Sequence, residues 1–123
     1  MFNVFRASRL FSRAEQLVAR QRNAEALPIA LEAWRILGGI KSRWGYMSSG
    51  RLTLVVTVSR LVDELGVRLG CEHAMVPLVK ESRALVVDAS TAVPEFASVQ
   101  FVRDHISWAD CRLEELSHRG GPG

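Results

Sequence analysis

ALPI at residues 26–29 is followed 49 positions later by MVPL at residues 75–78. Each copy is preceded by a similar helical ending, AEQL at 14–17 and VDEL at 62–65, and a third such ending, LEEL, occurs at 113–116. Self-similarity at a fixed period is the sequence signature of stacked supersecondary units. The repeat therefore predicts recurring helical hairpins, and it favours a binding scaffold over a catalyst.

Amphipathic periodicity predicts five helices around this repeat. The first, from Asn3 to about Arg20, carries apolar residues at the i, i+3, i+4, i+7 spacing of one helical face. The second begins near Asn23 and ends at Gly38 and Gly39, because glycine readily adopts the left-handed conformation that closes a helix. The remaining helices are predicted over Arg51–Gly66, Glu72–Asp88 and Pro94–Ser117, with a long loop at 39–50 and a turn at Ala89–Val93.

The segment Arg51–Gly66 is compatible with two secondary structures. Residues 53–58 (TLVVTV) are rich in β-branched side chains and would suit a strand. However, Val55 and Val62 belong to an apolar set with helical spacing, and the repeat also places a helix here. We therefore expect a helix, although β-branched residues lower its intrinsic propensity.

Length and composition indicate one all-α domain over residues 1–117, with a Gly- and Pro-rich tail at 118–123 that we expect to be disordered. No apolar run reaches the about 20 residues that span a bilayer. Cys71 and Cys111 form neither a disulfide framework nor a metal-ligand spacing, so we expect a cytoplasmic protein. The alternative is an organelle transit peptide in the acid-free residues 1–14.

Charge is distributed unevenly, although the net charge is only +3. Residues 1–22 hold one acid, Glu15, and five basic residues: Arg6, Arg9, Arg13, Arg20 and Arg22. The last predicted helix reverses this balance, with four acids against Arg103 and Arg112: Asp104, Asp110, Glu114 and Glu115. Ends of opposite sign can support stacking or self-association, an attraction that is weak and salt-sensitive when exposed.

Residues 14–37 and 60–86 resemble the A-turn-B centre of tetratricopeptide repeats, in which a small residue recurs on helix B. The resemblance covers roughly residues 7–88, with 94–117 as a terminal A-type helix, and the repeat is longer than the usual period of about 34 residues. Long-period members are familiar among bacterial regulatory proteins. The resemblance implies an antiparallel A-B-A-B-A array of two hairpins plus one helix, which binds a protein or peptide. The acidic-tail clamp of some members is not carried over, because its Asn and Lys residues do not occur at the matching positions.

If the three A helices align, Arg9, Thr57 and Trp108 fall in one row, with Arg60 in the next. An exposed Trp beside Arg residues is a plausible peptide anchor. We therefore list five candidate partner-binding residues: Arg9, Arg13, Thr57, Arg60 and Trp108. The alternative is an ordinary solvated face with Trp108 folded onto its own helix.

The last predicted helix carries an apolar seam that suits packing against another helix. Its residues step by three and four: Val99, Val102, Ile106, Ala109, Leu113 and Leu116. Because two repeats are fewer than the three or so that usually make a free-standing stack, we expect either a homodimer through this seam or a longer array of which the chain is a piece.

Other functions are less well supported by the residues. Arg112 and His118 have the loose spacing of a small helical ribonuclease, in which Arg would hold a phosphate and His would move a proton. The basic residues Arg6, Arg9 and Arg13 offer a nucleic-acid alternative, but without a broad Lys-rich patch we do not expect that partner. Asp110, Glu114 and His118 form no closed ligand set, so neither a metal nor another cofactor is predicted.

The predicted loop at 39–50 mixes cations with aromatic residues, namely Lys41, Arg43, Trp44 and Tyr46. Such residues can stack on bases and hold phosphates. Four residues are a small footprint, so we favour a loop whose aromatic rings pack back onto the helices.

Overall fold

The computed structural model describes residues 2–44 and 49–119, and within them every regular element is helical. Five α-helices and two short 3₁₀ turns follow one another: α1 (Phe2–Ala19), α2 (Asn23–Trp44), α3 (Ser49–Arg68), η1 (Glu72–Met75), α4 (Val76–Ala92), η2 (Pro94–Ser98) and α5 (Gln100–Arg119). The predicted all-α class with five helices is confirmed.

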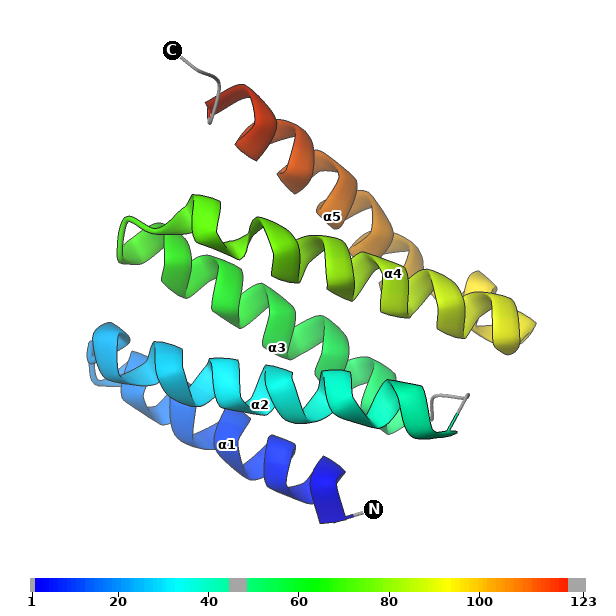
Figure 1. The fold of residues 1–123 in the computed structure, drawn as a ribbon, viewed down its shortest axis with the longest axis horizontal. Helices are drawn as coiled ribbons and strands as arrows, with labels where there is room; N and C mark the ends of the chain where they lie inside the picture. Colours follow the sequence, from blue (N-terminus) through cyan, green and yellow to red (C-terminus); the bar gives the residue numbers. More distant parts are fainter. Residues whose placement is uncertain (1, 45–48, 120–123) are drawn as a thin grey trace.

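The helices form two layers (Figure 1). Each helix packs against the next one in the chain, and α1 also contacts α3. In Figure 1, α2 and α4 form the front layer, and α1, α3 and α5 form the layer behind it. The three rear helices run in one direction and the two front helices run in the opposite direction. The antiparallel order of the five helices agrees with the array inferred from the sequence. It places α1 and α5 at opposite ends.

Small side chains bring α1 and α2 close together. Ala7 and Ala14 of α1 and three alanines of α2 at three- and four-residue spacing, Ala26, Ala30 and Ala33, are completely buried. A methyl side chain lets two helix backbones approach more closely than a Leu or Phe would. The first hairpin therefore gains its stability from close contact over its length.

The central position of α3 decides its secondary structure. Its buried residues lie on most of its circumference and include Leu52, Val55, Val58 and Val62, all with no accessible surface. Burying a Val or Leu side chain stabilises by about 1.5–3 kcal/mol, whereas a β-branched residue costs a helix at most about 0.7 kcal/mol. Packing therefore outweighs propensity, and the predicted helix is confirmed over the strand alternative.

The two hairpins are closed by the same kind of turn. Gln21 has φ +59° after α1, and Gly70 has φ +74° after α3. In each turn the next residue donates a backbone hydrogen bond five positions back, Arg22 to Leu17 at 2.9 Å and Cys71 to Gly66 at 2.8 Å. This is the Schellman pattern of a helix C-terminus. The two left-handed residues are 49 positions apart, the same spacing as the sequence repeat.

The end predicted for the second helix is wrong. α2 continues through Gly38 and Gly39 to Trp44, and α3 begins at Ser49, so no loop spans 39–50. Gly38 lies at a close approach, because a Cβ there would sit 2.9 Å from Glu81 Oε1 of α4. A glycine inside a helix costs about 1 kcal/mol relative to alanine, a cost that helix–helix packing can exceed. Tyr46 and the side chains of Lys41, Arg43 and Trp44 lie outside the described residues.

Three boundaries in the second half also differ from the predictions. Residues 89–92, predicted as a turn, belong to α4, where Ser90 and Thr91 donate hydrogen bonds to carbonyl groups one turn earlier. Pro94 opens the 3₁₀ turn η2, and α5 begins only at Gln100, after Val99 in extended conformation. At the other end, α5 includes His118 and Arg119, so the predicted tail begins too early. Residues 120–123 lie outside the described part.

Candidate functional site

Two of the predicted partner-binding residues meet between α3 and α5. The guanidinium carbon of Arg60 lies 5.2 Å from the centroid of the Trp108 ring, within the range of a cation–π contact. The Trp108 ring also stacks on His105, with ring centroids 5.2 Å apart and an interplanar angle of 27°. Trp108 is half-buried, so part of its side chain remains accessible.

The other three predicted residues do not join this pair. Thr57 donates a hydrogen bond to the carbonyl of Thr53 one turn earlier, at 2.9 Å. Arg9 and Arg13 are exposed on α1, and no interaction among the described residues links them to Arg60. Among the five predicted residues, the described interactions therefore join only Arg60 and Trp108.

A buried polar cluster, which no pattern in the sequence predicted, lies beneath the Arg60–Trp108 pair. His105 is completely buried between α3 and α4: its Nδ1 lies 3.4 Å from Nε of Arg60, and its Nε2 lies 3.2 Å from Oγ of Ser82. Ser82 donates its hydroxyl proton to the carbonyl of Val79, at 2.9 Å. Arg60 thus donates to an unprotonated Nδ1, and the Nε2–H donates to Ser82.

This environment keeps His105 neutral near pH 7. Burial, with a smaller contribution from the Arg60 charge, lowers the pKa of His105 to about 4. A Ser–His pair can serve as nucleophile and base when the serine is accessible and its proton points to the histidine. Here Ser82 is completely buried and its proton points to Val79, so the pair connects α4 to α5 and offers no nucleophile to a substrate.

A second buried cluster surrounds Arg112 of α5. Its guanidinium group donates to Asp63 at 2.7 Å, to Glu115 at 3.1 Å and to Glu72 at 3.4 Å. Hydrogen bonding to Asp63, the largest cause, raises the pKa of Arg112 above its ordinary value. Side-chain exposure is 9% for Arg112 and 7% for Asp63, so this ion pair is removed from solvent.

These contacts separate the two residues of the ribonuclease alternative. Arg112 is committed to three carboxylates inside the protein, where a phosphate cannot reach it. His118 lies on the exposed side of α5, with Nε2 3.8 Å from Glu114 Oε1 and 79% of its side chain accessible. The structure therefore does not assemble Arg112 and His118 into one site. In the described residues, no group of three or more His, Cys, Asp and Glu side chains is arranged to hold a metal ion.

The apolar seam predicted on the last helix is used inside the chain. Val102, Ala109 and Leu116 are buried, and Val99 and Ile106 pack against the main core. The buried side of α5 is rotated relative to the prediction, because His105 and Arg112 are buried while Ile106 and Leu113 stay half-exposed. This correction removes the seam as an exposed dimer interface.

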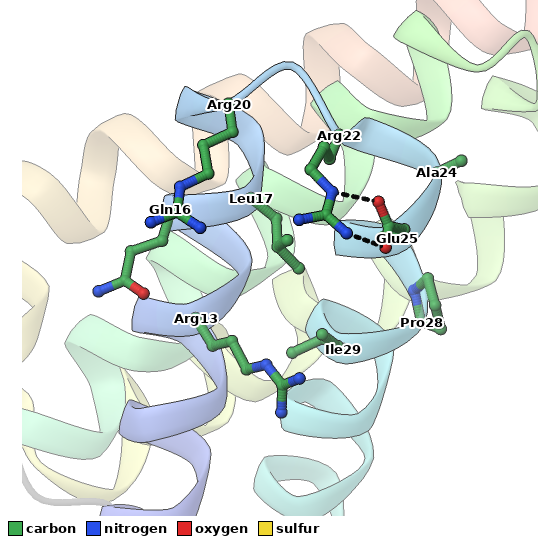
Figure 2. Close-up of a pocket in the computed structure, with 9 residues that line it drawn as sticks. All are labelled: Arg13, Gln16, Leu17, Arg20, Arg22, Ala24, Glu25, Pro28 and Ile29. Carbon is green, nitrogen blue, oxygen red and sulfur yellow. Dashed lines mark hydrogen bonds and ion pairs between the residues drawn. The ribbon is translucent and has the colours of Figure 1, made fainter.

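An open cleft of about 630 Å³ lies between the end of α1 and the start of α2 (Figure 2). It combines apolar and basic groups and is lined by Arg13, Gln16, Leu17, Arg20, Arg22, Ala24, Glu25, Pro28 and Ile29. The side chain of Arg13 points from α1 toward α2 in Figure 2. Across the turn, Arg22 and Glu25 form a two-pronged ion pair, in which the Arg22 hydrogen bond lowers the pKa of Glu25.

The charges of this cleft are not balanced. Arg22 and Glu25 neutralise each other, and Arg6, further along α1, lies 3.6 Å from Glu32. Arg13 and Arg20 form no ion pair within the described residues, so the cleft keeps two cations beside an apolar floor. The partner-binding residues predicted from the sequence include Arg13 but neither Arg20 nor the α2 residues, because the cleft forms only when the turn folds α2 back along α1.

Comparison with known proteins gives no relative: no family model, curated protein or solved structure matches this chain. Among the helices of residues 2–44 and 49–119, none is both long and apolar enough to cross a bilayer.

Proposed function

We propose that this chain is a non-catalytic helical scaffold that binds a protein or peptide at the α1–α2 cleft. The composition of the cleft carries the proposal: Leu17, Pro28 and Ile29 offer apolar surface beside the guanidinium groups of Arg13 and Arg20. Protein interfaces combine apolar contact with a polar rim, and arginine is enriched in them. A partner segment with an apolar side chain and flanking carboxylates would match both features.

The arrangement of helices supports the same proposal. The chain has two helical hairpins, with turns at Gln21 and Gly70, and a fifth helix. We propose that they form a short tetratricopeptide-like array. Stacked helical repeats present extended surfaces to protein partners. The burial of Ser82, His105 and Arg112 also favours a binding role, because the groups best suited to acid–base or nucleophilic chemistry stabilise the contacts of α5.

Site-specific photo-cross-linking tests the proposal. A photoreactive amino acid replaces Gln16, which lines the cleft, and in a matched control it replaces Lys80, an exposed residue of α4. In extracts of the native cell we expect one protein to be captured from position 16 and not from position 80. Reversing the charges with Arg13→Glu and Arg20→Glu should abolish that capture, and the purified partner should bind the unmodified chain directly.

Two results would overturn the proposal. Equal capture from positions 16 and 80 would mean that the cleft has no selectivity. Capture of nucleic acid in place of protein from position 16, lost at high salt, would support the alternative based on the arginines of α1.

A further inference from the structure

We infer that the partner of the α1 end is a second copy of this chain, which docks the outer side of its α5 there in a head-to-tail contact. The inference rests on the proposed function, because the contact uses the surface that contains the cleft. It replaces the seam-based dimer, since the inner side of α5 is buried while its outer side is exposed.

The two ends of the array carry exposed stripes of opposite charge. On α1 and the residue that follows it, the stripe, here called the α1 outer face, consists of Phe5, Arg9, Ser12, Gln16 and Arg20. On α5 the α5 outer face consists of Asp104, Ser107, Cys111, Glu114 and His118. Each set follows the three- and four-residue spacing of one helical face, and every member is exposed. With neutral His118 the formal charges are +2 and −2.

The charged groups on these faces are available to a partner. Arg9 and Arg20 form no ion pair within the described residues. Within residues 2–44 and 49–119, Asp104 accepts a hydrogen bond only from the neutral Gln100 amide, at 2.7 Å. Glu114 lies 3.8 Å from the mostly exposed His118, which is too far for a strong hydrogen bond. Opposite charges across an interface raise the association rate and set the orientation of the two partners.

The spacing of the charges also fits. Arg9 and Arg20 are eleven residues apart, or about 16 Å along a helix, and Asp104 and Glu114 are ten residues apart, or about 15 Å. Because α1, α3 and α5 run in the same direction, a second copy that continues the array sets its α1 parallel to α5 of the first (Figure 1). In that orientation Arg9 meets Asp104 near one end of the contact and Arg20 meets Glu114 near the other.

Exposed aromatic residues lie at the same end of the proposed contact. Phe5 precedes Arg9 by four residues and is 65% exposed, and Phe101 precedes Asp104 by three and is 37% exposed. Parallel docking brings the exposed parts of these two rings toward each other. A contact between two α1 outer faces would instead oppose like charges, so the head-to-tail arrangement is favoured. Such a heterologous contact continues from copy to copy unless the rotation closes a ring.

Sedimentation analysis of the full-length chain over about 10 µM to about 1 mM tests this inference, a range suited to an interface of small area. We expect the average mass to rise with concentration and to fall at high salt, because exposed charges are screened. Reversing the α1 charges (Arg9→Glu with Arg20→Glu) or the α5 charges (Asp104→Arg with Glu114→Arg) should each weaken association at least about tenfold. Combining all four substitutions in one chain, or mixing the two variants, should restore it.

Two further measurements make the result specific. The variant Arg35→Glu with Lys80→Glu reverses two exposed charges on α2 and α4, away from both faces, and should associate like the unmodified chain. Cys111 lies in the middle of the α5 outer face and is exposed, so its rate of alkylation should fall as the chain associates. The rate should stay constant with concentration in either charge-reversed variant.

The outcomes separate this inference from the proposed function. A chain that remains monomeric up to about 1 mM, or association that the four-fold substitution does not restore, overturns the inference. Sensitivity to the α1 reversal but not to the α5 reversal also overturns it, because the α5 outer face would then take no part in the contact. If a different protein is captured from position 16 by a monomeric chain, the proposed function holds and only the second-copy inference fails.

Discussion

Replacing Arg112 with alanine tests how strongly the buried ion cluster holds α5 to the rest of the array. The substitution removes the guanidinium group that contacts Asp63, Glu72 and Glu115. Asp63 would then be a buried carboxylate whose Oδ2 has lost its 2.7 Å partner and whose Oδ1 already has none. Breaking a buried ion pair on one side costs about 3–5 kcal/mol.

That cost is a large part of the whole stability, because a domain of this kind unfolds with a free energy of about 5–15 kcal/mol. The unfolding entropy expected for 123 residues is about 0.26 kcal/mol/K. A loss of about 4 kcal/mol therefore corresponds to a fall in Tm of about 15 °C. Urea unfolding followed by far-ultraviolet circular dichroism measures the change in free energy directly.

Two control variants identify the cause of the loss. Arg35→Ala removes an exposed guanidinium group from a comparable ion pair on α2 and should cost less than about 1 kcal/mol. Arg112→Met combined with Asp63→Leu removes both buried charges and should recover most of the stability lost in Arg112→Ala. A loss in Arg112→Ala no larger than that in Arg35→Ala would refute the reasoning, because Asp63 would then be as well solvated as a surface carboxylate.

The remaining predictions concern single groups in the described structure. The pKa of His105 is about 4 in the folded chain and near 6.5 when unfolded, so the unfolded state binds more protons between these values and stability falls as pH drops from about 6.5 to about 4. Urea unfolding at several pH values should show that the His105→Gln variant loses less stability over this pH range than the unmodified chain. An equal loss in both would exclude His105 as the titrating group. Gly66→Ala should destabilise by about 1–3 kcal/mol, because its Cβ would lie 2.6 Å from Met75 Cγ in the core. In Gly38→Ala the new Cβ approaches only the end of the flexible Glu81 side chain, so the substitution should be neutral or stabilising by up to about 1 kcal/mol. An equal fall in Tm for Gly66→Ala and Gly38→Ala would contradict the expectations for the two glycines. Gln21→Gly relieves a left-handed residue and should raise stability by about 0.5–1 kcal/mol, whereas a fall in Tm would show that the Gln side chain stabilises the turn.

The last helix shows where sequence reasoning succeeds and where it stops. Its apolar spacing predicted a helix and a buried stripe, and Val102, Ala109 and Leu116 are indeed buried. The stripe was centred wrongly, because it was drawn from apolar residues alone and so left out His105 and Arg112. They are buried because α3 and α4 supply partners for them, and those partners lie 23 to 49 residues away in the chain.

The candidate cleft was likewise predictable only in part from the sequence. The sequence alone shows that Arg13 belongs to an amphipathic helix and that the first 22 residues carry an excess of positive charge. Arg13 lies in one cleft with Pro28 and Ile29 only because the chain turns at Gln21. Glutamine seldom takes a positive φ, so this residue does not signal a turn in the sequence.

The sequence by itself determined the helical class, the number of helices, their order and the 49-residue spacing of the two hairpins. These properties follow from local periodicity and chain connectivity, which act over a few turns. Tertiary structure alone decided that α2 runs past Gly38, that His105 and Arg112 enter the interior, and that the acidic side of α5 remains exposed. The burial of His105 and Arg112 depends on what a neighbouring helix presents at the point of contact: a hydroxyl group at His105 and an aspartate at Arg112.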